Sequence, residues 1–167
     1  MIPRTAAETL KILARGYPVV AVTGPRQSGK TTLVRAAFPQ KPYVSLEDPD
    51  QREFAQDDPR RFLGRFADGA VLDEVQRCPA LFSYLQGRVD EDRRSGLFIL
   101  TGSQQFGLLS GVTQTLAGRV GFVRLLPFSL PELQAVARAP TELDELLYRG
   151  EYPPLYDRDV SPLHWHA

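Results

Sequence analysis

Short apolar runs alternate with longer helical patterns along most of the chain. A strand buried on both faces of a parallel sheet reads as a nearly continuous apolar run, and five such runs are present. They occupy residues 18–23, 42–46, 69–74, 97–102 and 120–126. Because the segments between them are long enough for helical crossovers, the pattern predicts an α/β protein with a five-stranded parallel sheet.

Helices are expected between and beyond these runs, where apolar residues recur with helical spacing. The expected helical segments are residues 8–15, 31–38, 48–58 with 59–66 as one or two helices, 79–94, 129–137 and 141–150. Residues 151–167 are rich in proline and aromatic side chains and are predicted to have little regularity. The chain therefore divides into a core of residues 1–127 and a partial helical lid or linker of residues 128–167.

The composition favours a globular, cytoplasmic protein. Its 167 residues are 43% apolar, and 20 basic side chains balance 20 acidic ones, so no overall field attracts nucleic acid or an anionic membrane. No apolar run approaches the roughly 18 residues of a membrane span, and the amino terminus lacks the apolar region of a signal peptide. The single cysteine, Cys78, excludes an internal disulfide and is interpreted as a structural residue.

A loop rich in small residues joins the run at 18–23 to the helix expected at 31–38. In its sequence, TGPRQSGKTT, two glycines, a lysine and a threonine match G-x-x-x-x-G-K-[ST], the Walker A phosphate-binding loop. The glycines let backbone N–H groups face phosphate oxygens, the lysine reaches the β- and γ-phosphates, and the threonine hydroxyl binds Mg²⁺. The residues expected to contact the nucleotide are Gly24, Pro25, Arg26, Gln27, Ser28, Gly29, Lys30, Thr31 and Thr32.

Two acidic residues, Asp73 and Glu74, end the third apolar run. A phosphate-binding loop needs a second ligand for its metal ion, normally an aspartate at the end of a neighbouring buried strand. We assign Asp73 to Mg²⁺ through water and Glu74 to polarising the attacking water, as in a Walker B motif. The second acid favours ATP hydrolysis over simple phosphate transfer.

Three further positions are candidates for the same chemistry. Ser103 or Gln104, after the fourth run, could sense the γ-phosphate or orient water, or could simply cap the turn into a helix. Arg119, before the fifth run, could stabilise charge on the transferring phosphoryl group, in cis or from a neighbouring subunit of a homo-oligomer, although a loop arginine is more often only solvated. Arg4 and Tyr17 lie at chain positions suited to flank a nucleotide base.

Four motifs in order, GPRQSGKTT, VLDEVQ, ILTGSQQF and LAGRVGFVRLLPFSLPEL, make the chain resemble prokaryotic AAA+-like ATPases that carry a carboxy-terminal domain of unknown function. The resemblance covers about residues 1–159. It implies a three-layer P-loop NTPase core of the AAA+/ASCE type, strand order 5-1-4-3-2, and ATP with Mg²⁺ as ligands. It also implies the roles given above to the loop and the acidic pair, Ser103 at the sensor position and Arg119 as an arginine finger.

Members of that family continue through a winged-helix-like segment and a second domain, so the chain is expected to be truncated relative to them. The absent domain would set the coupled partner, and the shortened lid is expected to preserve ATP binding better than turnover. The leading hypothesis is an ATPase that drives a conformational change. The alternatives are a non-catalytic nucleotide-binding or interaction module and a P-loop kinase with a small acceptor, although the basic residues of 59–66 favour a solvated helix face over an acceptor site.

Overall fold

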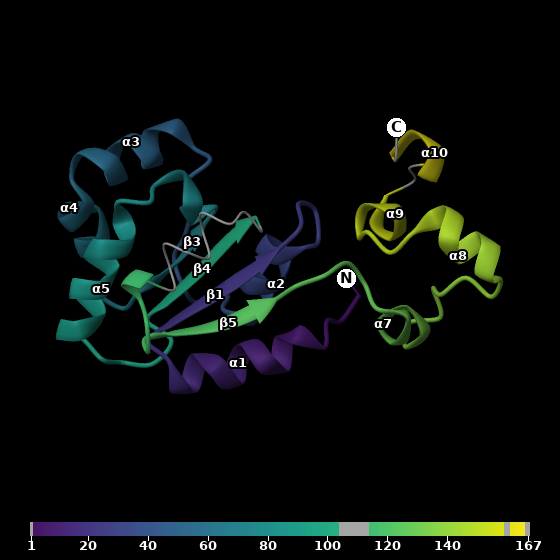
Figure 1. Ribbon diagram of the computed structural model, residues 1–167, viewed down its shortest axis with the longest axis horizontal. Helices are drawn as coiled ribbons and strands as arrows, with labels where there is room; N and C mark the ends of the chain where they lie inside the picture. Colours follow the sequence, from purple (N-terminus) through teal and green to yellow (C-terminus); the bar gives the residue numbers. More distant parts are fainter. Residues whose placement is uncertain (1, 104–113, 159–160, 166–167) are drawn as a thin grey trace.

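The computed structural model describes residues 2–103, 114–158 and 161–165, and within them a five-stranded sheet forms the centre of the molecule (Figure 1). Its strands are β1 (Val19–Gly24), β2 (Tyr43–Ser45), β3 (Ala70–Asp73), β4 (Phe98–Ser103) and β5 (Val120–Arg124). All neighbouring pairs are parallel, and the order across the sheet is β2-β3-β4-β1-β5. The expected parallel sheet and its strand order are confirmed.

Helices cover both faces of the sheet and make the expected three layers. The helices are α1 (Ala6–Gly16), α2 (Lys30–Ala37), α3 (Pro49–Asp57), α4 (Pro59–Gly64) and α5 (Leu81–Glu91), with a 3-10 helix at Val75–Arg77. On one face, Leu10 of α1 and Leu33 of α2 pack with Val20 and Val22 of β1. The opposite face of the sheet packs against α3, α4 and α5 in a larger apolar cluster.

Local sequence explains why residues 48–66 form two helices. Asp48 accepts a hydrogen bond from the Asp50 N–H at 3.0 Å, and Asp58 accepts one from the Arg61 N–H at 2.9 Å. Each aspartate is followed by proline, whose fixed φ suits the first helical position. Asp58 therefore begins α4 directly after α3 ends.

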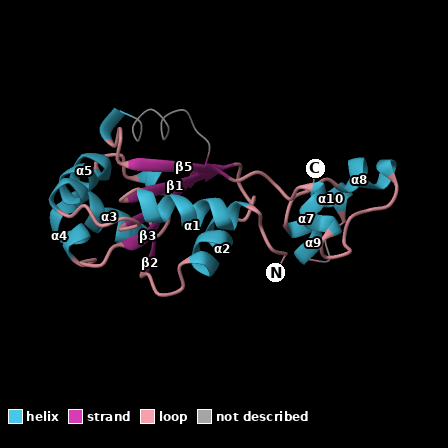
Figure 2. Cartoon of the chain, turned by 90° about the horizontal axis from the view of Figure 1, so that it is seen from below, coloured by secondary structure: helices cyan, strands magenta, loops and turns pink. Residues whose placement is uncertain are grey.

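The carboxy-terminal part of the described chain forms a separate group of short helices beside the sheet (Figure 2). They are α7 (Leu130–Gln134), α8 (Leu143–Arg149), α9 (Pro154–Asp157) and α10 (Pro162–Trp165). The two last helices correct the expectation that residues 151–167 lack regularity. Each has a single turn, which is too short for a periodic pattern, and α9 is held because Leu155 and Tyr156 pack against Phe128 and Ile2. The division of the chain into a core of residues 1–127 and a lid or linker of residues 128–167 stays a prediction.

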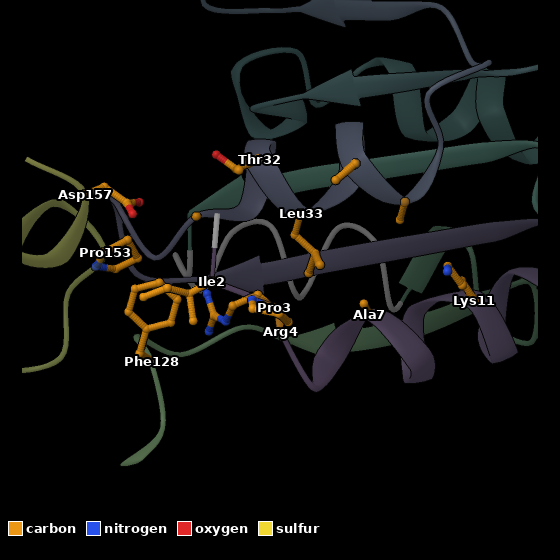
Figure 3. Close-up of a pocket in the computed structure, with 13 residues that line it drawn as sticks. Ile2, Pro3, Arg4, Ala7, Lys11, Thr32, Leu33, Phe128, Pro153 and Asp157 are labelled. Carbon is orange, nitrogen blue, oxygen red and sulfur yellow. The ribbon is translucent and has the colours of Figure 1, made fainter. Parts of the chain in front are cut away.

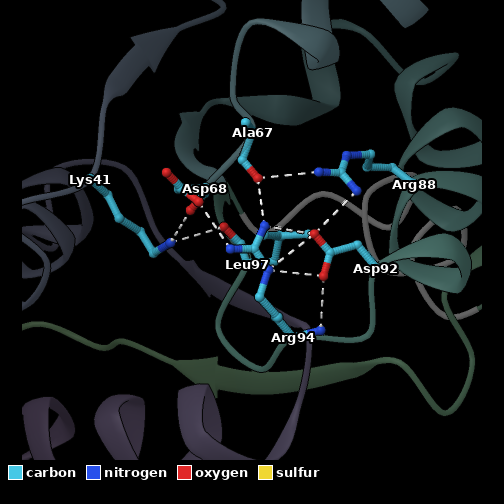
Figure 4. A network of polar contacts seen from close by, with 7 residues as sticks. All are labelled: Lys41, Ala67, Asp68, Arg88, Asp92, Arg94 and Leu97. Carbon is cyan, nitrogen blue, oxygen red and sulfur yellow. Dashed lines mark hydrogen bonds and ion pairs between the residues drawn. The ribbon is translucent and has the colours of Figure 1, made fainter.

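A polar network ties together the two loops that enter β3 and β4 (Figure 4). Arg94 donates to the Ala67 carbonyl at 2.7 Å and to carboxylate oxygens of Asp92 and Asp68. Lys41 Nζ donates to the carbonyls of Asp68 at 3.0 Å and Leu97 at 3.1 Å. These contacts lie at the edge of the sheet where the strands begin.

Cys78 lies fully inside the larger apolar cluster, and burial raises the pKa of its thiol. Among the described residues, no helix combines the length and the apolar character that crossing a bilayer requires.

Candidate functional site

The loop between β1 and α2 begins and ends at glycines that the structure requires. A Cβ at Gly24 would lie 2.0 Å from the Leu125 carbonyl oxygen, so the backbone just after β5 leaves no room for a side chain at that position. Gly29 has φ of +90°, in the left-handed region that glycine adopts without cost. The loop therefore curls closely against β5 and delivers the chain into the amino terminus of α2.

Lys30 lies buried under this loop. Its Nζ donates to the carbonyl oxygens of Gly24 at 3.2 Å and Pro25 at 2.8 Å. Burial lowers the pKa of Lys30, against the opposing effect of the nearby carboxylates of Glu74 and Asp73. The amine is thus fixed by the loop carbonyls and faces the acidic pair.

Asp73 ends β3 and accepts hydrogen bonds from three hydroxyl groups. Thr31 Oγ1 lies 3.1 Å from Oδ2, the Tyr43 hydroxyl lies 2.6 Å from the same oxygen, and Thr101 Oγ1 donates to Oδ1. Tyr43 reaches the site because β2 pairs with β3, with Ser45 opposite Asp73. The predicted pair of Thr31 and Asp73 is brought together, whereas Tyr43 and Thr101 were not expected.

The oxygens around Asp73 fit Mg²⁺. This ion prefers carboxylate and hydroxyl oxygens, keeps several waters, and is completed by phosphates of the substrate more often than by protein side chains alone. Among the described residues, no group of three or more His, Cys, Asp or Glu is arranged to hold a metal ion, and Thr31 with Asp73 offers the smaller oxygen set that a metal–phosphate complex needs.

Glu74 follows in a strained conformation, with φ of 55° and ψ of 45°. A non-glycine residue in this region costs about 1–3 kcal/mol, and such strain is common at functional sites. The Glu74 N–H donates to Thr101 Oγ1 at 3.2 Å, which stabilises the conformation. The same threonine therefore orients both members of the acidic pair.

Gln76, which sequence reasoning missed, links the Glu74 carboxylate to the end of β4. Its Nε2 donates to Glu74 and, at 3.1 Å, to Ser103 Oγ. Ser103 is thereby brought to the predicted site, beside Gly24 in the register of β1 and β4. Gln104, the other candidate, lies outside the described residues.

A cleft of about 550 Å³ opens over the loop. Its walls include Arg26, Lys30 and Thr31 from the loop region and Glu74 from the acidic pair. Further lining residues are Gln27, Gly29, Thr32, Glu47, Arg77, Pro153, Pro154, Asp157 and Arg158. The contribution of α9 was not predicted, because its residues lie in the segment expected to be irregular.

A second, largely apolar cavity of about 230 Å³ adjoins the cleft (Figure 3). Ile2, Arg4, Leu33 and Phe128 line it, and it shares Gly29, Thr32, Pro153 and Asp157 with the cleft. Arg4 is therefore close to the loop, and its place beside a base stays a prediction. Tyr17 is not: it precedes β1 and lies against Gly121 at the opposite edge of the sheet, which contradicts its predicted position.

Arg119 is also separated from the loop within one chain. It precedes β5, whereas Lys30, Asp73 and Ser103 lie at the ends of strands or just after them. Its Nε and one terminal nitrogen donate to the two carboxylate oxygens of Asp90, at 2.6 and 3.0 Å. A parallel sheet places the beginnings and the ends of its strands at opposite edges, so Arg119 cannot reach the loop of its own chain and the in-cis alternative is wrong. The role of Arg119 in a neighbouring subunit stays a prediction.

Comparison with known protein families gives one domain match, in which residues 16–134 fit a model described as an AAA domain. Two uncharacterized proteins, from Mycobacterium bovis and Mycobacterium tuberculosis, are each 35% identical to the chain over 156 residues. The alignments cover 92% of the chain and 34% of each relative. The chain thus spans about a third of the length of the curated relatives it matches.

Solved structures with the same fold include a Walker-type ATPase of Pyrococcus abyssi and AMPPCP-bound DnaA from Aquifex aeolicus. The first has a TM-score of 0.58 at 19% identity, and the alignment covers 92% of this chain and 65% of the Pyrococcus abyssi chain. The second also has a TM-score of 0.58, at 18% identity, and the alignment covers 91% of this chain and 56% of the DnaA chain. At these identities the likeness shows the fold.

Proposed function

This chain belongs to the AAA domain family of AAA+-like P-loop ATPases, and from that premise we propose that it binds ATP at the loop of residues 24–32 and hydrolyses it with Mg²⁺. The observation that carries the proposal is the meeting of Lys30 and Thr31 with Asp73 and Glu74 at one edge of the sheet. A loop lysine, a hydroxyl, and two acids in sequence are the groups that water-dependent phosphoryl transfer requires.

The two adjoining cavities suit the two ends of a nucleotide. The cleft is lined by cationic and hydroxyl side chains that complement phosphates, and the apolar cavity beside it suits a flat, largely apolar base. We place the base between Leu33 and Phe128, and the phosphates along the loop toward Lys30. When bound, Mg²⁺ would neutralise charge on the phosphate oxygens, held by Thr31 and Asp73.

We propose a role in hydrolysis for each of the side chains at the site. Glu74 accepts the proton of the attacking water, and Gln76 holds that carboxylate beside Ser103. Lys30 stabilises the charge that develops on the phosphate oxygens. We propose Ser103 as the sensor of the γ-phosphate, because Gln76 links its hydroxyl to the Glu74 carboxylate and a change at one would be felt at the other.

Hydrolysis would also act on the carboxy-terminal helices α7 to α10, called the helical segment below. Pro153, Asp157 and Arg158 line the cleft from α9 and from the residues directly before and after it, so the contents of the cleft would contact both the loop and this segment. Loss of the γ-phosphate removes negative charge facing Arg158. We propose that this change moves the segment relative to the sheet, and that Arg119 of a second copy completes the site in an oligomer.

The proposed function is tested by measuring ATP binding and phosphate release, with and without Mg²⁺, across a wide range of protein concentration. Mg²⁺-dependent release supports the ATPase, and a specific rate that rises with concentration supports the intersubunit arginine. ATP binding without release at any concentration would favour the non-catalytic alternative. Nucleotide consumption that requires an added acceptor would instead indicate a kinase.

Replacing Tyr43 with Phe is expected to raise the Mg²⁺ concentration needed for half-maximal hydrolysis by about tenfold. The reason is that the Tyr43 hydroxyl orients Asp73, the proposed metal ligand, through a hydrogen bond. Burial and the hydrogen bond to Asp73 raise the pKa of Tyr43 well above its usual value, so the hydroxyl remains a donor throughout the neutral range. ATP binding without Mg²⁺ serves as the control and should be unchanged. An unaltered Mg²⁺ dependence would contradict this role.

A further inference from the structure

Arg4 joins three parts of the chain that lie far apart in sequence. One terminal nitrogen donates to the Ser28 carbonyl at 2.8 Å, and the other donates to the carbonyls of Leu126 at 2.6 Å and Pro127 at 3.1 Å. Its Nε lies 3.3 Å from the Glu132 carboxylate in α7. The guanidinium therefore connects the phosphate-binding loop with the helical segment.

Glu132 fixes Arg4 in this position. The Arg4 side chain is 9% exposed and that of Glu132 4%. The carboxylate also accepts from the N–H groups of Thr5 at 2.7 Å and Ser129 at 2.9 Å. Burial alone would raise the pKa of Glu132, but these amide hydrogen bonds and the charge of Arg4 hold it below its usual value. The two residues form a buried ion pair with no net charge.

The contact with Ser28 determines how the loop presents its backbone. The Ser28–Gly29 peptide bond is trans, and in a trans peptide the C=O and N–H groups point in opposite directions. Because Arg4 holds the Ser28 carbonyl, it turns the Gly29 N–H away from itself. A flipped peptide would instead present a carbonyl oxygen, which repels phosphate. Glycine at position 29 makes such a flip sterically easy, so the hydrogen bond from Arg4 to the Ser28 carbonyl is needed to hold the peptide in one orientation.

We propose that Arg4 is a positioning residue that holds the Gly29 N–H in the orientation that binds phosphate, and that Glu132 makes this orientation depend on the helical segment. The proposal rests on the proposed nucleotide binding and extends it. Through Glu132, the helical segment would then control phosphate affinity by way of the loop backbone, in addition to any contact that α9 makes with the contents of the cleft. Direct attraction by Arg4 is a minor effect, since Glu132 neutralises its charge.

The test measures binding of tripolyphosphate, which has no base and so cannot report on the apolar cavity. The paired variant Arg4→Met with Glu132→Gln leaves no buried unpaired charge and does not change the net charge. We expect its tripolyphosphate affinity to be about tenfold weaker than that of the wild type, as for the loss of a charge-assisted hydrogen bond. The variant Arg94→Met with Asp92→Asn, which removes an ion pair at the opposite edge of the sheet, should bind as the wild type does.

A second measurement follows the Gly29 amide resonance by ¹H–¹⁵N NMR during the titration. It should move strongly on addition of tripolyphosphate to the wild type and weakly in the Arg4/Glu132 variant. A variant with a lowered melting temperature but wild-type affinity and a wild-type Gly29 shift would overturn the proposal, since Arg4 would then be only structural. A wild-type chain that binds neither ATP nor tripolyphosphate would overturn the proposed function, and this proposal with it.

Discussion

Replacing Glu74 with Gln is expected to reduce ATP hydrolysis by about a hundredfold or more, which is the usual contribution of a positioned general base, while ATP binding persists. The amide has nearly the shape of the carboxylate, and its oxygen can still accept from Gln76 Nε2. The strained backbone at position 74 and its hydrogen bond to Thr101 are unaffected. Only the ability to take a proton from water is lost.

The measurement is phosphate release in a single turnover, beside the dissociation constant of ATP for the same preparation. Glu47→Gln is the matched control, because Glu47 also lines the cleft and the change in charge is identical. Its side chain is 59% exposed and pairs with Arg77, so we do not expect it to act as the general base. An equal loss in both variants would indicate a general effect of charge and would contradict the role of Glu74.

Replacing Lys30 with Ala is expected to weaken ATP binding by about a hundredfold, which corresponds to about 2.7 kcal/mol. The amine already lies within the loop, held by the carbonyls of Gly24 and Pro25, so little reorganisation is needed to engage the β- and γ-phosphates. Arginine could not substitute, because its broad planar head would not fit a ring of backbone groups. Hydrolysis should be lost together with binding.

Lys41→Ala provides the control for this substitution. Lys41 also donates to two backbone carbonyls, its burial likewise lowers its pKa, and it lies at the other edge of the sheet. Its removal should lower the melting temperature without changing the ATP dissociation constant. Equal hydrolysis by the wild type and Lys30→Ala would be incompatible with the proposed function.

The framework of the fold could be predicted because it depends on local patterns. β1, β3 and β4 are buried along their whole length, and each begins with three or four apolar residues in a row. β2 and β5 are partly exposed but also contain enough apolar residues to be recognised. The loop at 24–32 and the acidic pair were found by spacing alone. These features are encoded in neighbouring residues, whereas the strand order came from the family resemblance.

What could not be predicted depends on which distant segments meet. Tyr43 reaches Asp73 only because β2 pairs with β3, and nothing in the run at 42–46 marks a hydroxyl that faces a metal site. Arg4 meets Glu132 across 128 positions of sequence. The in-cis role predicted for Arg119 was wrong because Arg119 comes directly before β5, whereas the phosphate-binding loop comes directly after β1. In a parallel sheet, residues before a strand and residues after a strand lie at opposite edges.

The order of strands in the sheet has a consequence for how the chain folds during synthesis. The loop of residues 24–32 is made early, yet its strand, β1, lies between β4 and β5, which come last in chain order among the five strands of this sheet. A nascent chain that ends before residue 98 carries the full phosphate-binding sequence without either neighbour of β1. If ATP binds at this loop as proposed, we expect it to stabilise the fold only late in synthesis, because both neighbours of β1 must first be translated.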